Sequence, residues 1–298
     1  MIPGPIRVGA ASIRAIVEQE SVSFGIDSLL GSVDPALIEA NRDWLVPDHL
    51  DPVTGMAHLS HHAWLVETGR YRILVDPCVG NGRDRPIIPP YHQLDTPWIE
   101  RLEAAGVTPE QIDFVLCTHL HVDHCGWNTR LVDGRYVPTF PNARYIFTRA
   151  EQDFWSRELT EELPRRYAFN RGIYAECVQP VIDAGLAWVV EGDESFADLF
   201  TLIPCPGHTQ GHVAGLLDGG TDGALFVGDV LHSPLQVIDP TINGLGNADA
   251  AMAVESRCAM LQLASDRNLL LAPGHFRGSR ACRVSPTRGG FAIEWLSK

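Results

Sequence analysis

Positive charge is scarce in this sequence, and it is not clustered anywhere. The 298 residues include 23 Lys and Arg against 37 Asp and Glu, which gives a formal net charge of −14. Proteins that bind nucleic acid or anionic membrane surfaces depend on basic patches. The shortage of clustered Lys and Arg therefore argues against a nucleic-acid or membrane partner and leaves a small-molecule substrate as the expected partner.

Long apolar runs and a dense cysteine pattern are also missing. No run approaches the roughly 18–20 apolar residues of a membrane-spanning helix, and the first twenty residues lack the sustained apolar stretch of a signal peptide. The seven cysteines, an odd number, form no disulfide framework. We therefore expect a cytoplasmic protein with reduced thiols and no intramolecular disulfide, and the sequence leaves a homodimer open.

Short apolar runs recur along the chain, and we interpret them as strands. Residues 63–66 and 71–75 flank a turn around Gly69 and predict a hairpin. The later runs are 114–117, 144–147, 186–190, 200–203, 213–217, 224–227 and 269–272. Helices are predicted over 97–112 and 247–267, with Asn247 or Asp249 as the N-cap of the second. Strands in two groups with helices between them predict an α/β layered domain.

The remaining segments suggest how this domain is organised. Residues 1–57 are punctuated by Pro and Gly without a regular period, so we expect an N-terminal arm packed on a main domain of residues 58–298. Within the main domain, residues 150–182 are rich in aromatic side chains and are predicted to form a helical insertion.

Candidate metal ligands follow four of the predicted strands. They are His119, His121, Asp123 and His124 after 114–117, His208 after 200–203, Asp229 after 224–227, and His275 after 269–272. Residues i and i+2 of an extended loop project to the same side, so His119 and His121 can hold one ion while Asp123 and the next histidine face a second. Imidazole and carboxylate without thiolate favour zinc, with Mn, Fe or Co as alternatives, at an open catalytic site.

Several other titratable residues are expected to be structural. An isolated histidine is usually a hydrogen-bonded core residue, and this interpretation covers His49, His58, His61, His62 and His92. Three cysteines near the ligands, Cys117, Cys125 and Cys205, are expected to pack rather than to bind metal, since the ligand set is complete without them. His212 is expected to support the ligands or to pack in the core.

Four motifs, in this order and spacing, resemble those of the metallo-β-lactamase-fold hydrolases. They are THLHVDH at 118–124, PGHTQGH at 206–212, GDV at 228–230 and PGH at 273–275. The resemblance covers residues 58–277 and implies a four-layer αβ/βα sandwich with two mixed sheets and a dinuclear metal site. It further implies that His119, His121 and His208 hold the first ion. Asp123, His124 and His275 would hold the second, with Asp229 bridging both.

Further residues distinguish between the branches of this family. A bridging Asp229 argues against the true β-lactamases, and His121 argues against flavo-diiron members, which carry glutamate there. The nuclease branch usually has an extra domain and a basic surface, neither of which is evident. GDVLHSPLQ resembles methyl parathion hydrolase-like enzymes, whereas THLHVDHCG and PGHTQGH resemble N-acyl-homoserine lactonases equally well. Those lactonases carry tyrosine where this chain has His232.

The resemblance implies a dinuclear hydrolase that cleaves an ester or lactone of a small, largely apolar substrate by a metal-bridging hydroxide. Asp229 would hold both ions, and Asp123 would carry the proton to the leaving group. His232 would either donate to the developing oxyanion or hydrogen-bond a carboxylate. The alternatives are a phosphotriesterase or thioesterase on the same site, a mononuclear iron persulfide dioxygenase, and a non-catalytic metal-sensing module.

Aromatic residues in the insertion bear on the substrate. Phe154, Trp155, Tyr167, Phe169 and Tyr174 lie there, and Trp127 follows the ligand cluster. They either form the buried face of the insertion or, for one or two of them, wall an apolar pocket beside the metals.

Overall fold

The structure is a computed structural model that describes residues 4–220 and 222–296. The predicted N-terminal segment 1–57 therefore begins with three residues that lie outside the described part. By internal contacts the chain divides into two compact units, which we call the first unit (Met1–Gln19 and His61–Ala197) and the second unit (Glu20–Ser60 and Asp198–Lys298). The predicted boundary between an arm and a main domain at residue 57 stays a prediction.

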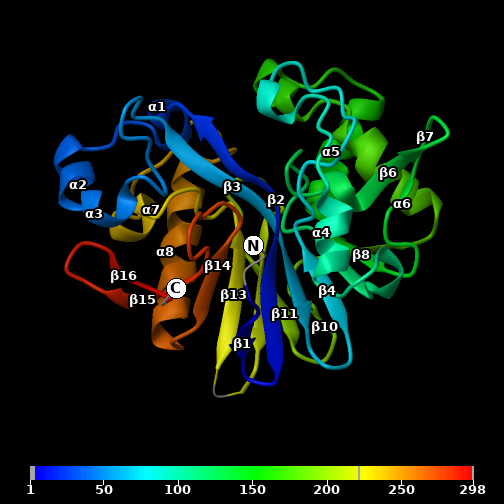
Figure 1. Ribbon diagram of the computed structural model, residues 1–298. Coiled ribbons are helices and arrows are strands. Elements are labelled where there is room, and N and C mark those ends of the chain that lie inside the picture. The colour runs from blue at the N-terminus through cyan, green and yellow to red at the C-terminus, as the bar shows by residue number, and fades with distance from the viewer. Residues whose placement is uncertain (1–3, 221, 297–298) are drawn as a thin grey trace. The chain divides into compact units, whose positions relative to one another are not determined.

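One mixed sheet has the strand order β1-β2-β3-β4-β5-β8-β9 (Figure 1). Its strands are β1 Ile6–Val8, β2 Ala11–Phe24, β3 Ala57–Glu67, β4 Arg72–Val75, β5 Phe114–Leu116, β8 Arg144–Thr148 and β9 Ala187–Val190. β3 and β4 form the predicted antiparallel hairpin, whereas β4, β5, β8 and β9 run parallel to one another. The carboxyl ends of these parallel strands share one edge of the sheet, where ligands commonly bind in α/β proteins.

A second mixed sheet has the order β10-β11-β12-β13-β14-β15-β16. Its strands are β10 Ser195–Phe196, β11 Phe200–Pro204, β12 Val213–Asp218, β13 Gly223–Gly228, β14 Leu270–Pro273, β15 Cys282–Pro286 and β16 Phe291–Trp295. β13 pairs with β14 in parallel, and both read as continuous apolar runs because both are wholly buried. β6 Thr129–Val132 and β7 Arg135–Pro138 form a separate two-stranded hairpin.

The helices of the first unit are short. They are α4 Trp98–Ala104, α5 Arg149–Trp155 and α6 Gln179–Asp183. The first unit also has five short 3₁₀ helices and one π-helix among its described residues. The 3₁₀ helices are η1 Pro89–Tyr91, η2 Pro109–Gln111, η3 Gly126–Asn128, η4 Ser156–Leu159 and η5 Arg165–Asn170, and the π-helix is η6 Tyr174–Val178. Residues 149–183 thus form a mostly helical segment, and its assignment as an insertion stays a prediction.

The second unit contains one long helix, α8 Ala250–Asp266, together with α1 Ile26–Leu30, α2 Pro35–Ala40, α3 Arg42–Leu45 and α7 Leu235–Ile238. Asp249 is the N-cap of α8, and its side chain accepts a hydrogen bond from Met252 N at 3.0 Å. One face of α8 contributes Met260, Leu261 and Ala264 to a core cluster with β12, β13 and β14.

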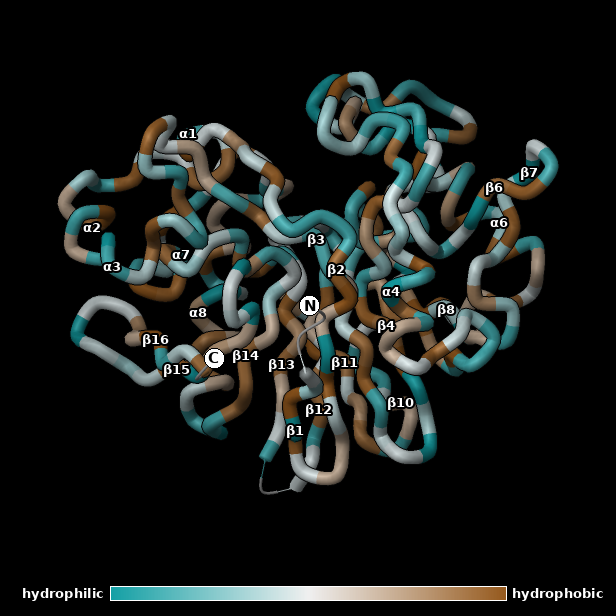
Figure 2. Tube along the Cα trace, viewed as in Figure 1, coloured by the Kyte–Doolittle hydropathy of each residue, from teal (hydrophilic) through white to brown (hydrophobic). Residues whose placement is uncertain are grey.

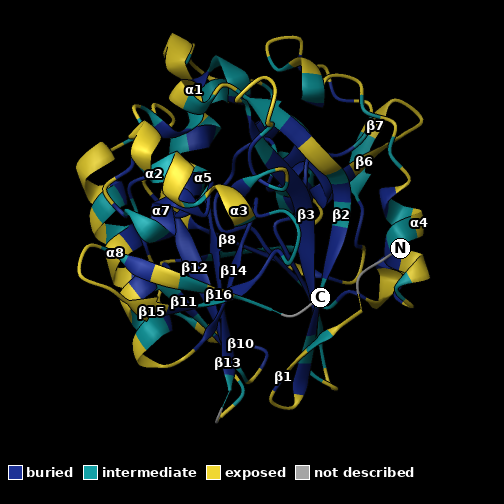
Figure 3. Cartoon of the chain, turned by 60° about the vertical axis from the view of Figure 1, so that its left-hand side comes forward, coloured by how far each residue is buried: buried dark blue, intermediate teal, exposed yellow. Residues whose placement is uncertain are grey.

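The distribution of hydrophobic residues explains the two sheets. In Figure 2 hydrophobic stretches, coloured brown, run along the strands. In Figure 3 strands β12 and β14 are dark blue, which marks buried residues, whereas α2 shows exposed residues in yellow. The α/β class with two mixed sheets, predicted from the sequence, is confirmed.

One long strand was not predicted. β2 has 14 residues and lies within the segment expected to be an irregular arm. Its inward positions, such as Ala11, Ile13 and Ala15, alternate correctly for a strand, but a buried Glu18 interrupts the apolar series. The Glu18 carboxylate accepts hydrogen bonds from Val79 N, Gly80 N and Trp127 Nε1, which satisfies it inside the core.

The backbone at Gly126 has no room for a side chain. A Cβ there would lie 1.7 Å from Val79 O, and the Gly126 N–H donates to Cys78 O at 2.7 Å. We predict that Gly126→Ala lowers the free energy of unfolding by about 3 kcal/mol, because the two loops must separate. Urea unfolding measures the change.

Gly246→Ala is the matched control for this prediction. Nothing lies within 4 Å of a Cβ at Gly246, and its φ is not positive. Its effect should stay within about 0.5 kcal/mol. Equal unfolding midpoints for the two variants would contradict the close approach of the loops.

Candidate metal centre

In the first unit the candidate ligands lie on the loop that follows β5. Asp76, just after β4, holds the start of this loop: its Oδ1 accepts from Thr118 N at 2.7 Å and its Oδ2 from Thr118 Oγ1 at 2.9 Å. Asp76 has φ of 54°, a left-handed conformation that aspartate tolerates better than most residues. The ends of two neighbouring parallel strands are therefore joined by a buried carboxylate.

Three imidazoles of this loop lie close together and are buried. The ring centroid of His119 is 4.5 Å from that of His121 and 4.1 Å from that of His124. His119 Nδ1 lies 3.1 Å from Thr118 Oγ1, and His124 Nδ1 lies 3.0 Å from Asp76 Oδ2. Metal-binding histidines commonly present one ring nitrogen to the ion while an oxygen holds the other, so Nε2 is the expected ligand atom of both.

Asp123 is held by two residues that the sequence did not connect with it. Its Oδ2 accepts a hydrogen bond from Tyr91 Oη at 3.1 Å and lies 3.2 Å from His61 Nε2. Tyr91 Oη is also 2.7 Å from His61 Nε2, and both residues are buried. The sequence predicts an ordinary core histidine at His61, but His61 belongs with Asp123 among the candidate metal-binding groups.

The insertion supports the back of the same loop. Glu151, on α5, accepts hydrogen bonds from Leu120 N at 3.0 Å and from Trp155 Nε1 at 2.9 Å. Asn170 Nδ2 donates to Leu120 O at 2.9 Å. The Phe169 ring meets the His121 ring edge-on, with centroids 4.9 Å apart. The insertion therefore fixes the loop on both sides of Leu120.

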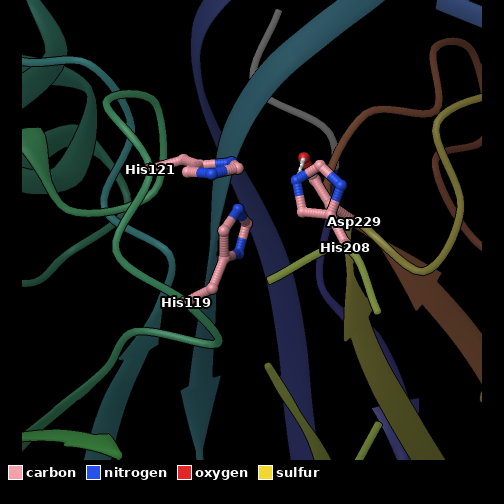
Figure 4. A group of neighbouring side chains, drawn as sticks. All are labelled: His119, His121, His208 and Asp229. Atoms are coloured by element: carbon pink, nitrogen blue, oxygen red, sulfur yellow. Dashed lines mark ion pairs between the residues drawn. The ribbon is translucent and has the colours of Figure 1, made fainter. Parts of the chain in front are cut away.

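In the second unit the candidate ligands follow β11, β13 and β14. His208 Nδ1 lies 3.0 Å from Asn247 Oδ1, and His275 Nδ1 lies 3.1 Å from Ser60 O. Figure 4 labels His208 and Asp229, which form an ion pair, and also labels His119 and His121 on the loop of the first unit. As in the first unit, an oxygen atom beside Nδ1 orients each of these two histidine rings.

Three imidazoles of this unit surround the buried Asp229 carboxylate. Its Oδ2 lies 3.3 Å from His208 Nε2 and 3.1 Å from His232 Nε2, and its Oδ1 lies 2.9 Å from His275 Nε2. Burial lowers the pKa of His232, and the neighbouring Asp229 carboxylate acts in the opposite direction. The two carboxylate oxygens therefore face different imidazoles.

His212 and the nearby cysteines have supporting positions. His212 Nε2 accepts from Asp229 N at 3.1 Å and His212 Nδ1 lies 3.1 Å from Cys205 Sγ, so both ring nitrogens are engaged. Burial raises the pKa values of the Cys117, Cys125 and Cys205 thiols, which keeps them protonated at neutral pH. These positions agree with the packing roles expected from the sequence.

The other histidines expected to be structural lie in varied surroundings. The buried His49 stacks on Trp295. His58 lies beside Ser23 and Asp51, and His62 meets the Trp64 ring. All seven cysteines are among the described residues and are free thiols.

The donor set fits a divalent metal ion. The candidate groups consist of histidine and aspartate alone. Four of the rings carry an oxygen at Nδ1, which is the usual way a protein orients a metal-binding imidazole. Such a set suits Zn, Mn, Fe or Co.

Comparison with known proteins identifies the family. The family model of the metallo-beta-lactamase superfamily matches residues 57–275, and the chain belongs to this superfamily. The crystal structure of the hydrolase AbOPH of the beta-lactamase superfamily superposes with a TM-score of 0.79 at 22% identity, covering 99% of this chain and 97% of that one. AidC, a dizinc quorum-quenching lactonase, superposes with a TM-score of 0.74 at 18% identity, covering 99% and 97%. These likenesses confirm the predicted fold class.

A curated relative points to the same group of proteins. The N-acyl homoserine lactonase of Bacillus sp is 24% identical over 186 residues, which is 62% of this chain and 64% of the relative. The chain thus spans less than two thirds of the length of this relative. Across the described residues, no helix is both long and apolar enough to cross a membrane.

Asp76 offers a test of how the ligands are oriented. We predict that Asp76→Asn lowers the affinity for Zn²⁺ about 10- to 100-fold, because an amide offers only one acceptor oxygen where the carboxylate serves Thr118 and His124. Competition with a chromophoric chelator measures the affinity.

Asp193→Asn serves as the control, since Asp193 is exposed and lies on another loop of the first unit. It should bind Zn²⁺ as the wild type does. If Asp76→Asn and Asp193→Asn share the same affinity, the carboxylate of Asp76 has no part in orienting the ligands.

Proposed function

We propose that this protein is a dinuclear metallohydrolase that cleaves an ester or lactone bond of a small, largely apolar substrate. His119, His121 and His208 would hold the first ion, and Asp123, His124 and His275 the second. Asp229 would bridge the two. The observation that carries this proposal is the arrangement at Asp229, where Oδ2 faces His208 and Oδ1 faces His275, histidines assigned to different ions.

Two divalent ions, most simply zinc, would acidify a water molecule and polarise the substrate carbonyl. The protein residues would then manage protons and geometry. Asp229 orients the site through its two oxygens. Asp123, oriented by the Tyr91 hydroxyl, would accept the proton of the attacking water and return it to the leaving oxygen as the acyl C–O bond breaks. The products would be an acid and an alcohol, joined in one molecule when the substrate is a lactone.

His232 had two candidate roles in the sequence. The distance of 3.1 Å from His232 Nε2 to Asp229 Oδ2 favours the role of holding a carboxylate over donation to the oxyanion. In this proposal His232 fixes the oxygen of Asp229 that also faces His208. The histidine thus replaces, at this position, the tyrosine of the lactonases that the sequence resembles.

The surroundings of the first-unit ligands favour an uncharged acyl substrate. Phe169 is half-buried and touches His121, so an aromatic face lies beside a ligand. The insertion also carries an open pocket of about 520 Å³, but neither Phe169 nor a candidate ligand lines it, so it does not bear on the substrate. An aromatic face beside a ligand suits an acyl or aryl group, and the net charge of −14 disfavours a polyanionic substrate.

The other aromatic residues mostly have packing roles. Trp155 and Tyr174 are buried, and Trp127 stacks on Trp98 while its Nε1 donates to Glu18. Phe169 is therefore the residue to test. The free thiols suit a reducing compartment, and we propose the cytoplasm as the location.

A substrate series tests the proposed function. We predict that the zinc-loaded protein hydrolyses N-acyl lactones or aryl esters, and that kcat/KM rises at least roughly tenfold over four added acyl methylenes, since each buried methylene adds binding energy. Removal of metal with a chelator should abolish turnover, and added Zn²⁺ should restore it. Phe169→Ala should flatten the series.

Phe154→Ala is the matched control, because Phe154 packs on Trp155 and Tyr167 within the same insertion. It should leave the dependence on chain length in place. Three results would contradict the proposal: a flat series, a preference for paraoxon-type triesters or thioesters, and oxygen consumption by protein holding a single iron.

A further inference from the structure

Two adjacent residues in the middle of α8 donate hydrogen bonds to two different ligand loops of the second unit. Ser256 Oγ donates to Pro206 O at 2.6 Å, and Arg257 Nε donates to Val230 O at 2.9 Å. Pro206 comes two residues before His208, and Val230 comes one residue after Asp229. Neither Ser256 nor Arg257 is a metal ligand in the proposed function.

The loop that carries His208 is closely joined to the start of α8. His208 O accepts from Ala248 N at 3.0 Å, and Gly207 O accepts from Asp249 N at 2.9 Å. A Cβ at Gly207 would lie 2.2 Å from Ala253 N, so the loop approaches the helix backbone without space for a side chain. Ser256 adds a further hydrogen bond one turn along α8.

The loop that carries Asp229 and His232 depends on Arg257 in a similar way. Arg257 is 1% exposed, and its Nη1 donates to Pro240 O and to Ile242 O, each at 2.7 Å. Together with Val230 O, three backbone carbonyls of the segment 230–242 thus accept hydrogen bonds from this one guanidinium. Gln236, in the same segment, accepts from His232 N at 2.8 Å and donates to Ile242 O.

The charge of Arg257 makes this arrangement unusual. No carboxylate of the described residues lies within ion-pair distance of it; three backbone carbonyls accept its hydrogen bonds, and Asp239 attracts the cation from farther away. Burial lowers the pKa of Arg257 to about 10, which still leaves the guanidinium protonated at neutral pH. A buried charge is costly unless it is fully hydrogen-bonded, and a neutral side chain would serve mere packing at lower cost.

We propose that Ser256 and Arg257 are positioning residues that set the spacing of His208 and Asp229, and thereby the metal affinity of the second unit. One rigid helix fixes both loops, because consecutive residues of α8 donate to each. The inference rests on the proposed function for the identity of the ligands. It adds that α8, rather than the strands alone, holds the 3.3 Å separation of His208 Nε2 and Asp229 Oδ2.

Metal binding by Arg257 variants tests the proposal without any substrate. We expect Arg257→Met to weaken the binding of Co²⁺ about 10- to 100-fold and to change the visible d–d spectrum of the cobalt-loaded protein. Arg257→Lys keeps the charge but cannot donate to all three carbonyls, so it should restore the affinity in part. Ser256→Ala should weaken binding a few-fold, and it keeps the proposal testable if the Arg257→Met protein does not fold.

Arg280→Met is the matched control. Arg280 is another buried arginine of the second unit, and it donates to Gly278 O and pairs with Glu20. We expect it to lower the melting temperature of the metal-free protein as Arg257→Met does, with an unchanged cobalt spectrum and affinity. Wild-type cobalt affinity and spectrum in Arg257→Met and Ser256→Ala would overturn the proposal, as would an equal loss of affinity in Arg280→Met.

Different results would contradict the proposed function and the positioning role of α8. A wild-type protein that binds metal but hydrolyses no ester or lactone would contradict the proposed function and leave the positioning role of α8 intact. Hydrolysis by the wild type, together with unchanged metal binding in the α8 variants, would contradict the positioning role alone.

Discussion

The Asp229 carboxylate is the group on which the site most depends. It is 4% exposed, and its neighbours within ion-pair distance include the imidazoles of His208, His232 and His275. A buried carboxylate without compensating charge would be costly, whereas one that binds cations is stabilised. Much of the second unit serves to hold this group and its imidazoles, through Ser60, His212, Asn247 and α8.

In the first unit a different carboxylate, that of Asp76, orients the loop that carries the candidate ligands. Asp76 does not lie among the proposed ligands, yet it hydrogen-bonds the loop at Thr118 and faces His124 Nδ1. Glu151 and Asn170 hold the loop from the insertion, and Glu18 holds the turn after β4 together with Trp127. In both units oxygen atoms orient the rings through Nδ1, and those beside His124, His208 and His275 come from segments far along the chain.

The sequence predicted the strands that precede the candidate ligands and the longest helix. Apolar runs predicted β5, β11, β13 and β14, which the candidate ligands follow; of the two caps that the sequence offers for α8, Asn247 and Asp249, the structure has Asp249. The sequence did not reveal β2, because the adjacent Ala15 and Ile16 are both buried, which shifts the alternation, and because Glu18 is a buried carboxylate. Nor did it connect Asp123 with His61 and Tyr91, since these contacts join segments far apart in the chain. Residues that support a ligand through such contacts carry no local pattern, whereas the ligands themselves are grouped in short motifs.

In the proposed function, two metal ions share the carboxylate of Asp229. X-ray absorption of the protein loaded with two equivalents of Zn²⁺ tests it most directly. We expect shells of imidazole nitrogen and carboxylate oxygen around both ions, with a zinc–zinc distance of about 3.5–4 Å, and loss of the zinc–zinc scattering in Asp229→Ala. Bound zinc without zinc–zinc scattering in the wild type, or scattering that persists in Asp229→Ala, would contradict it.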